Sequence, residues 1–117
     1  MMKTPLLIIL LFALSSAARA ENSNYYCEGD TTSTIGNGPH VEEVDTRTHA
    51  FIGNETEFDS EKVKCEITQK MIYCHSKKSK RTLEINKVTG YTSDSYEIFK
   101  SGKANTKVEF IGMCELY

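Results

Sequence analysis

The sequence is short of three features that would point to common protein classes. After residue 20 it has no long apolar run, no stretch with the period of a long helix, and no internal repeat. We therefore expect no membrane-spanning helix in that part, because such a helix needs roughly 20 apolar residues. The absence of helical periodicity favours an all-β fold.

The first twenty residues have the features of an export signal. Lys3 gives a positive start, 6–14 form an apolar run, and Ala18-Arg19-Ala20 matches a small-x-small cleavage site. We predict a signal peptide over 1–20 that is cleaved, and one secreted β domain over 21–117. The mature protein should be a monomer that is periplasmic or secreted.

The stretch 63–76 predicts a β-hairpin. Cys65 and Ile67 alternate with polar neighbours, and Ile72 and Cys74 do the same further along. A turn at 69–70 places Ile67 opposite Ile72 and Cys65 opposite Cys74. Opposed residues of an antiparallel pair come within disulfide reach, so one register suits both the apolar face and the thiols.

The chain has four cysteines, which after an export signal indicate two disulfides. Four thiols allow three pairings, and the sequence alone does not choose among them. The hairpin favours Cys65–Cys74. That pairing leaves Cys27–Cys114 to join the first strand to the last.

Short runs of β-branched and aromatic residues, separated by polar turn residues, continue along the chain. Further strands are predicted at 24–28, 41–48, 50–52, 82–86, 91–99 and 108–116. We expect loop or ragged edge at 29–40, one helical turn within 56–62, a turn at 88–90 and a polar loop at 100–105. The fold class is all-β, a small antiparallel barrel or sandwich of about seven or eight strands.

Charge is unevenly distributed. Without 1–20, 12 Lys and Arg oppose 16 Asp and Glu, a net charge of −4 that gives no reason to expect nucleic-acid binding. Residues 21–61 hold ten acids and one base, whereas 62–117 hold six acids and eleven bases. Acidic strands that pair beside basic ones explain this most simply. The acidic run Glu55, Glu57, Asp59 and Glu61 is either solvated surface or a face for a cationic protein.

Two groups of residues are candidates for binding. The basic cluster is Lys77, Lys78, Lys80 and Arg81. It is either a solvated hairpin tip or a site for an anionic partner. Tyr26 and Tyr91 are the tyrosines that we expect to face outwards, where a ring with a polar tip suits a binding surface.

No catalytic, metal or cofactor motif is visible. All four thiols are explained by disulfides, and His40, His49 and His75 belong to no recognisable triad motif. Cys74 and His75 point to opposite faces of a strand, and no C-x2-C pair exists, so we expect no metal site. We therefore expect no enzyme and no cofactor. Asn54-Glu55-Thr56 is a glycosylation sequon only if the source organism glycosylates secreted proteins.

The second half carries a resemblance to a protein group. Leu83-Glu84-Ile85-Asn86-Lys87-Val88-Thr89-Gly90, followed by Phe110-Ile111-Gly112-Met113-Cys114, resembles the ending of many small, exported, uncharacterised bacterial β-proteins. These share an "I-N-basic-x-T-G" strand and turn and a closing "F-x-G-x-C" strand. The resemblance implies export, disulfides and an all-β fold, and no activity.

A second resemblance is architectural. Tyr25-Tyr26-Cys27, with a late partner in Cys114, is similar to the inhibitors of c-type lysozyme, small β-barrels closed by an end-to-end disulfide. Their functional loop carries a Ser-Gly-x-x-Tyr motif. Neither Thr89-Gly90 nor Ser101-Gly102 is followed by tyrosine at that spacing, so no lysozyme-blocking residue is transferred.

The sequence therefore predicts a small, exported, disulfide-stabilised binding module that inhibits or sequesters a secreted or periplasmic protein. The alternative is an envelope-associated accessory protein that binds an anionic lipid or glycan through the basic hairpin tip. A partner for either function is a protein or an anionic surface, not a nucleic acid.

Overall fold

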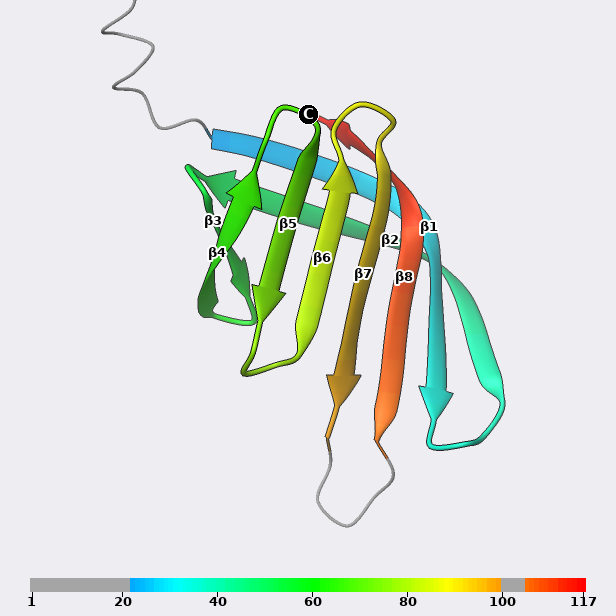
Figure 1. The fold of residues 1–117 in the computed structure, drawn as a ribbon. Helices are drawn as coiled ribbons and strands as arrows, with labels where there is room; N and C mark the ends of the chain where they lie inside the picture. The colour runs from blue at the N-terminus through cyan, green and yellow to red at the C-terminus, as the bar shows by residue number, and fades with distance from the viewer. Residues whose placement is uncertain (1–21, 100–104) are drawn as a thin grey trace, which may run out of the picture.

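The described elements of the chain are all strands. A computed structural model describes 22–99 and 105–117. In chain order its strands are β1 (Asn22–Ile35), β2 (His40–Ile52), β3 (Glu55–Phe58), β4 (Glu61–Ile67), β5 (Met71–Ser76), β6 (Arg81–Asn86), β7 (Tyr91–Ile98) and β8 (Thr106–Leu116). Each strand pairs antiparallel with the next, and β1 pairs with β8, so the eight strands form a closed barrel (Figure 1). The predicted all-β barrel is confirmed.

Two predicted segments are not described by the structure. The signal peptide over 1–20 lies outside the described residues, as does most of the loop predicted at 100–105. In the part that is described, no helix is long and apolar enough to span a membrane.

The β4–β5 hairpin forms as its sequence predicts. Cys65 lies opposite Cys74 and Ile67 opposite Ile72, and the two cysteines are disulfide-bonded. The Thr68 hydroxyl accepts the amide hydrogens of Lys70 and Met71, at 3.2 and 3.0 Å. The turn chemistry and the disulfide therefore support the same register.

The second predicted disulfide, Cys27–Cys114, closes the barrel. It joins directly opposed residues of β1 and β8 across a sequence separation of 87. In the loop-entropy description a crosslink of this span stabilises the fold by about 4.5 kcal/mol. The two disulfides together indicate an oxidising compartment, as expected of an exported protein.

The core follows from the alternation of side chains along the strands. Tyr25 packs edge-on against Phe51, with ring centroids 5.9 Å apart. The buried apolar residues that surround this pair come from every strand except β2 and β7: Cys27, Phe58, Val63, Cys65, Ile72, Cys74, Leu83, Ile85, Phe110 and Cys114. The barrel interior is therefore filled by side chains.

Closure between β1 and β8 depends on two opposed glycines. Gly29 lies directly across from Gly112. A Cβ at Gly29 would collide with the carbonyl oxygen of Ile111, and a Cβ at Gly112 with that of Glu28. The two backbones therefore approach more closely than any larger residue would allow.

Two local predictions were wrong. The segment 29–40 is mostly strand, since β1 continues to Ile35 and the chain turns only at 36–39. Pairing with β2 on one side and β8 on the other compensates for its weak strand propensity. The segment 56–62 contains no helical turn. It holds β3, a two-residue turn and the start of β4, because Asp59 and Ser60 adopt positive φ values of 49° and 74°.

The turn predicted at 88–90 is confirmed. The side-chain oxygen of Asn86 accepts the amide hydrogens of Val88 and Thr89, at 2.9 and 3.0 Å. Gly90 then takes a φ of 87° and its carbonyl accepts the amide hydrogen of Cys114. The Asn–x–x–Thr–Gly pattern thus ties the β6–β7 turn to the last strand.

Candidate functional site

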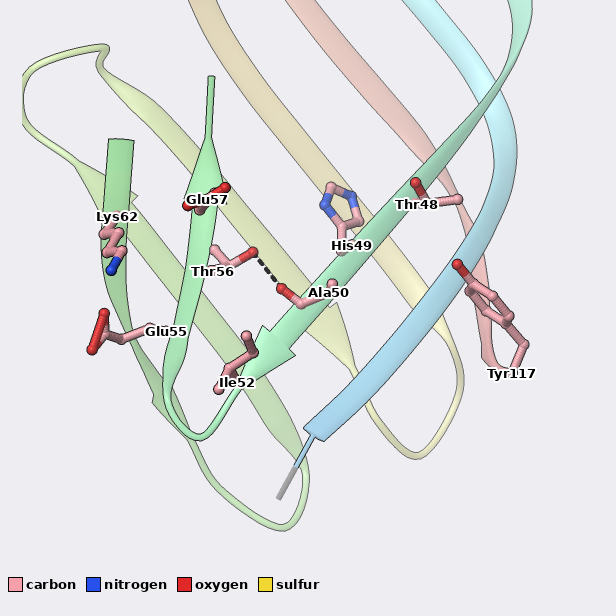
Figure 2. A pocket seen from close by; sticks show the side chains of 9 residues that line it. All are labelled: Thr48, His49, Ala50, Ile52, Glu55, Thr56, Glu57, Lys62 and Tyr117. Atoms are coloured by element: carbon pink, nitrogen blue, oxygen red, sulfur yellow. Dashed lines mark hydrogen bonds between the residues drawn. The ribbon is translucent and has the colours of Figure 1, made fainter. Parts of the chain in front are cut away.

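The barrel is weakly joined between β2 and β3. These strands share one register pair, Ile52 with Glu55, whereas β3 and β4 share four. Beyond that pair, the Thr56 hydroxyl donates to the Ala50 carbonyl at 2.8 Å, so a side chain replaces a backbone ladder bond. Figure 2 shows the two strands separating from the turn at 53–54. We call this opening the β2–β3 seam.

A pocket of about 550 Å³ occupies the β2–β3 seam. The strand alternation places its lining mainly on the outer face of the barrel. The lining residues are Thr48, His49, Ala50 and Ile52 of β2, Glu55, Thr56 and Glu57 of β3, Lys62 of β4, and the C-terminal Tyr117 (Figure 2). Its volume lies within the range of small-molecule and side-chain binding pockets, about 300–1,000 Å³.

His49 is the buried polar residue of this pocket. His49 is 7% exposed, and its ring projects from β2 into the space between β2 and β3 (Figure 2). The Nε2 atom is buried and has no hydrogen-bond partner among the residues that the structure describes. Burial lowers the pKa of His49 to about 4, against an opposing effect of Asp94. The imidazole is therefore neutral near pH 7, with an unsatisfied nitrogen.

A second polar cluster lies inside the barrel. The fully buried carboxylate of Asp94 accepts hydrogen bonds from Arg81, at 2.9 and 2.7 Å, and from Arg47, at 3.0 Å. Burial is the largest single effect and acts to lower the pKa of Arg81, but the hydrogen bond and charge of Asp94, with smaller contributions from Tyr96 and Asp59, together raise the pKa. Both guanidinium groups also lie over aromatic rings, those of Phe58, Tyr96 and Phe110.

This inner cluster satisfies its own charges. Asp45 provides a second carboxylate for Arg47, at 3.3 Å, and also accepts the Thr31 hydroxyl at 2.8 Å. That hydroxyl hydrogen bond is the main cause of a lowered pKa of Asp45. Two arginines thus oppose two aspartates. The arrangement explains how a carboxylate is buried in the barrel, and it leaves no free group for chemistry.

The structure separates the four members of the predicted basic cluster. Lys77, Lys78 and Lys80 are exposed in the β5–β6 turn, and the ammonium of Lys80 lies 5.2 Å from the centre of the Phe99 ring. Arg81 instead begins β6 and turns inwards to Asp94, with 15% of its side chain exposed. The basic tip therefore consists of three lysines.

The two predicted outward tyrosines share one face of the barrel. Tyr26 lies opposite Glu115, and Tyr91, which is 50% exposed, lies opposite Met113 on the other side of β8. Tyr26 is half-buried because its ring packs edge-on against Tyr117, at 6.5 Å. Since Tyr117 lines the pocket, Tyr26 lies next to the β2–β3 seam, whereas Tyr91 lies on the far side of β8, at the start of β7.

Most residues of the pocket were not singled out by the sequence. The acidic run is divided by the strand alternation: Glu55 and Glu57 line the pocket, Asp59 lies in a turn, and Glu61 accepts the Ser76 hydroxyl at 2.8 Å. The pocket forms where β2, β3 and β4 lie beside the C-terminal Tyr117, which is distant from them in sequence. A local sequence pattern does not predict such a contact. In 22–99 and 105–117, no group of three or more His, Cys, Asp or Glu is arranged to hold a metal ion.

Comparisons with known proteins add no identity. No protein-family model, no curated protein and no solved structure matches the chain. The resemblances to small exported bacterial β-proteins and to lysozyme inhibitors therefore stay predictions.

Proposed function

We propose that this protein is a non-enzymatic binding module that inhibits or sequesters a secreted or periplasmic protein through the β2–β3 seam. The observation that carries the proposal is a pocket on the outside of a closed barrel, with a buried histidine nitrogen that nothing in 22–99 or 105–117 satisfies. A bound partner would supply that hydrogen bond.

The barrel supports such a role because it holds the seam in place. On one side the seam is bordered by β2, which pairs with β1 along its whole length, and β1 is tied to β8 by Cys27–Cys114. The strands on the other side are tied by Cys65–Cys74. A binding surface whose backbone is already ordered loses little conformational entropy when a partner docks.

The tyrosines beside the pocket favour a protein partner. Tyr117 is 71% exposed, lines the pocket and packs against Tyr26. Tyrosine is enriched among the residues that dominate protein–protein binding energy, since its ring offers a large contact area at a small entropic cost. The pocket and the tyrosine pair therefore form one continuous candidate surface.

Affinity capture from envelope and secreted-protein extracts tests the proposal. Ala50 lines the pocket on the outer face, so Ala50→Arg should fill the pocket without entering the core. We expect the oxidised protein to retain one protein at high salt and the Ala50→Arg variant to lose it.

The matched control is Val44→Arg. Val44 lies on the same outward side of β2, is 88% exposed and does not line the pocket. It should retain the partner. Equal retention by both variants would contradict the proposed surface, and so would the absence of any protein retained at high salt.

The structure also favours a second candidate function, binding of an anionic lipid or glycan by the basic tip. The exposed lysines Lys77, Lys78 and Lys80 are joined there by the ring of Phe99, which is 51% exposed and lies under the Lys80 ammonium. Lysines beside an exposed aromatic ring suit the surface of an anionic membrane, where each charge is worth about 1 kcal/mol.

Vesicle sedimentation separates the two functions. Vesicles containing phosphatidylglycerol should retain the protein at low salt but not at high salt, and phosphatidylcholine vesicles should not retain it at either. The double variant Lys77→Glu and Lys78→Glu should lose this binding while it keeps the captured protein partner. Lipid binding that survives the double variant would exclude the tip as the site.

A further inference from the structure

The edge of β2 that faces the seam is unpaired over most of its length. β2 pairs with β1 along its whole length, but on its other side it pairs only at Ile52. In an antiparallel strand the backbone groups of alternate residues point to the same side, so those of Thr46, Thr48 and Ala50 face the seam.

Two of these three residues already have one backbone group bonded to a side chain. The Ala50 carbonyl accepts the hydroxyl hydrogen of Thr56 at 2.8 Å. The Thr46 amide donates to Asp45 at 2.8 Å. Thr48 lies between them in the pocket lining, and among the described residues no bond from its backbone to the seam side is found. Along the pocket, Thr48 is thus the residue of this edge with neither backbone group bonded among the described residues, and beyond Thr46 the edge continues unpaired.

The outer part of the pocket is acidic. Glu55 and Glu57 line it, and of its charged residues only Lys62, which lies opposite Glu57, is basic. The surrounding strands β1 and β2 add Glu28, Asp30, Glu42, Glu43 and Asp45. Their one basic residue, Arg47, is bound to Asp45 and Asp94. The field at the seam therefore favours a cation.

The unsatisfied Nε2 of His49 is an independent indication of a ligand. The residue is more than nine-tenths buried, at 7% exposure, and lines the same pocket. A buried polar nitrogen without a partner costs free energy unless a water or a ligand supplies the hydrogen bond. The pocket therefore combines three polar features: the carboxylates of Glu55 and Glu57, the unpaired backbone of Thr48, and the unsatisfied nitrogen of His49.

We infer that the β2–β3 seam binds an extended peptide segment that carries a lysine or arginine side chain. The backbone of the segment pairs with Thr48, its cationic group lies at Glu55 and Glu57, and its polar atoms or a carried water satisfy His49. This inference rests on the proposed function and names the chemistry of the partner. It is a form of strand addition to the unpaired edge of β2.

The unpaired backbone of Thr48 favours a peptide over a free amine. A free polyamine would satisfy the carboxylates but would leave the Thr48 carbonyl and amide without a strand partner. An extended segment satisfies both, and its alternating side chains direct every second residue towards the pocket. Tyr117 at the rim offers an apolar ring against which the stem of a lysine packs.

The probe is a capped heptapeptide of alternating threonine and lysine, titrated into the ¹⁵N-labelled oxidised protein. We expect chemical-shift changes centred on the amides of Thr48, His49 and Ala50. The matched peptide with glutamate in place of lysine should bind at least about tenfold more weakly, a difference of 1.4 kcal/mol. A lysine peptide N-methylated on the pairing edge, and spermine, should show a similar loss.

A pair of variants locates the cation. Glu57→Gln removes a pocket carboxylate on the exposed side of β3, and should weaken the lysine peptide by about tenfold. The control, Glu43→Gln, removes an acid of β2 outside the pocket and should change binding by less than about twofold, since exposed distant charges are screened.

The outcomes distinguish this inference from the proposed function. The inference is overturned if the shifts lie away from the seam, if the glutamate peptide or spermine binds as well as the lysine peptide, or if Glu57→Gln has no effect. If the lysine peptide fails while Ala50→Arg still abolishes capture of a protein, the seam binds a folded surface, and the proposed function stands without the extended segment.

Discussion

The β4–β5 and β2–β3 pairs are both antiparallel neighbours joined by a short turn, yet they differ in how they are held. β4 and β5 share three register pairs, one of them a disulfide, and their turn is bonded by Thr68. β2 and β3 share one pair and a side-chain bond from Thr56. The barrel thus places its disulfides away from the seam, where one edge of β2 stays largely unpaired.

The difference also appears in what fills the interior behind each pair. Behind β4 and β5 the core is apolar, with Ile72, Leu83 and Ile85 almost completely buried. Behind β2 the inward residues are Arg47, His49 and Phe51. Arg47 is bonded to Asp94, and the charges of Asp94 and Arg81 act on His49. A polar interior needs every charge paired, so this side of the barrel is the more sensitive to single substitutions.

The largest effect is expected from Asp94→Ala. The substitution leaves Arg47 and Arg81 facing each other within the barrel without their shared carboxylate. Removing one partner of a buried ion pair lowers the free energy of unfolding by about 3–5 kcal/mol. Denaturant unfolding measures the loss, and Asp45→Ala, whose carboxylate is 40% exposed, is the milder control. A loss below that of Asp45→Ala would show that the inner cluster does not hold the β2 side in place.

The next effect is expected from Cys74→Ser, which removes the cross-link of the well-held pair and frees Cys65. The free energy of unfolding should fall by roughly 2–4 kcal/mol. Denaturant unfolding measures this loss. Thiol counting on the oxidised wild-type protein is the control, and a reactive Cys65 or Cys74 there would contradict the pairing. The binding of the lysine peptide should be unchanged, because the disulfide lies outside the pocket lining.

A pH dependence is expected from His49. Its pKa in the folded protein, about 4, lies below the unfolded value of 6.5, so the unfolded chain binds more protons between these values. The stability that this residue contributes is present above pH 6.5 and is lost as the pH falls towards 4, by up to about 3 kcal/mol. Unfolding measured from pH 7 to pH 4 should show this decline.

The control is His49→Gln, which removes the titration and keeps a polar side chain. The groups that face the ring electrostatically, Asp94, Arg81 and Arg47, are unchanged by this variant. Its unfolding free energy should depend less on pH over the same range. A decline of equal slope in the variant would assign the acid sensitivity to other groups.

The smallest effect is expected from Thr56→Val, which removes the side-chain bond across the seam. The carbonyl of Ala50 loses its donor, and the unfolding free energy should fall by about 1 kcal/mol. Hydrogen exchange should become faster in β3 and stay unchanged in β5. Equal acceleration in both strands would mean that the seam and the β4–β5 hairpin open as one unit.

The sequence predicted what short-range patterns determine. Cys65, Ile67, Ile72 and Cys74 admit one register that suits both packing and thiol geometry, and the structure has that register. The turn at 88–90 was equally local, because Asn86 and Gly90 are sufficient to specify it. Cys65–Cys74 and the all-β fold were therefore predicted from residues close in sequence. Cys27–Cys114 was predicted as the pair that remained.

The sequence did not predict what depends on distant strands. Arg81 follows three exposed lysines, yet its position in β6 turns it towards Asp94. Asp94 itself lies in a polar Ser-Asp-Ser stretch of β7, whose composition does not suggest burial. The alternation of Thr92, Asp94 and Tyr96 was the available signal. The seam was not visible because it depends on where β2 and β3 separate and on where the C-terminus ends. No short pattern encodes such an opening.

Amide hydrogen exchange at Thr48 tests the central claim most directly. In the free oxidised protein we predict rapid exchange at Thr48 and slow exchange in the β4–β5 hairpin, followed by protection of Thr48 when the lysine peptide or the captured partner is added. Slow exchange at Thr48 in the free protein, as slow as in β5, would show that the edge is closed and would contradict the account of the seam as the binding site.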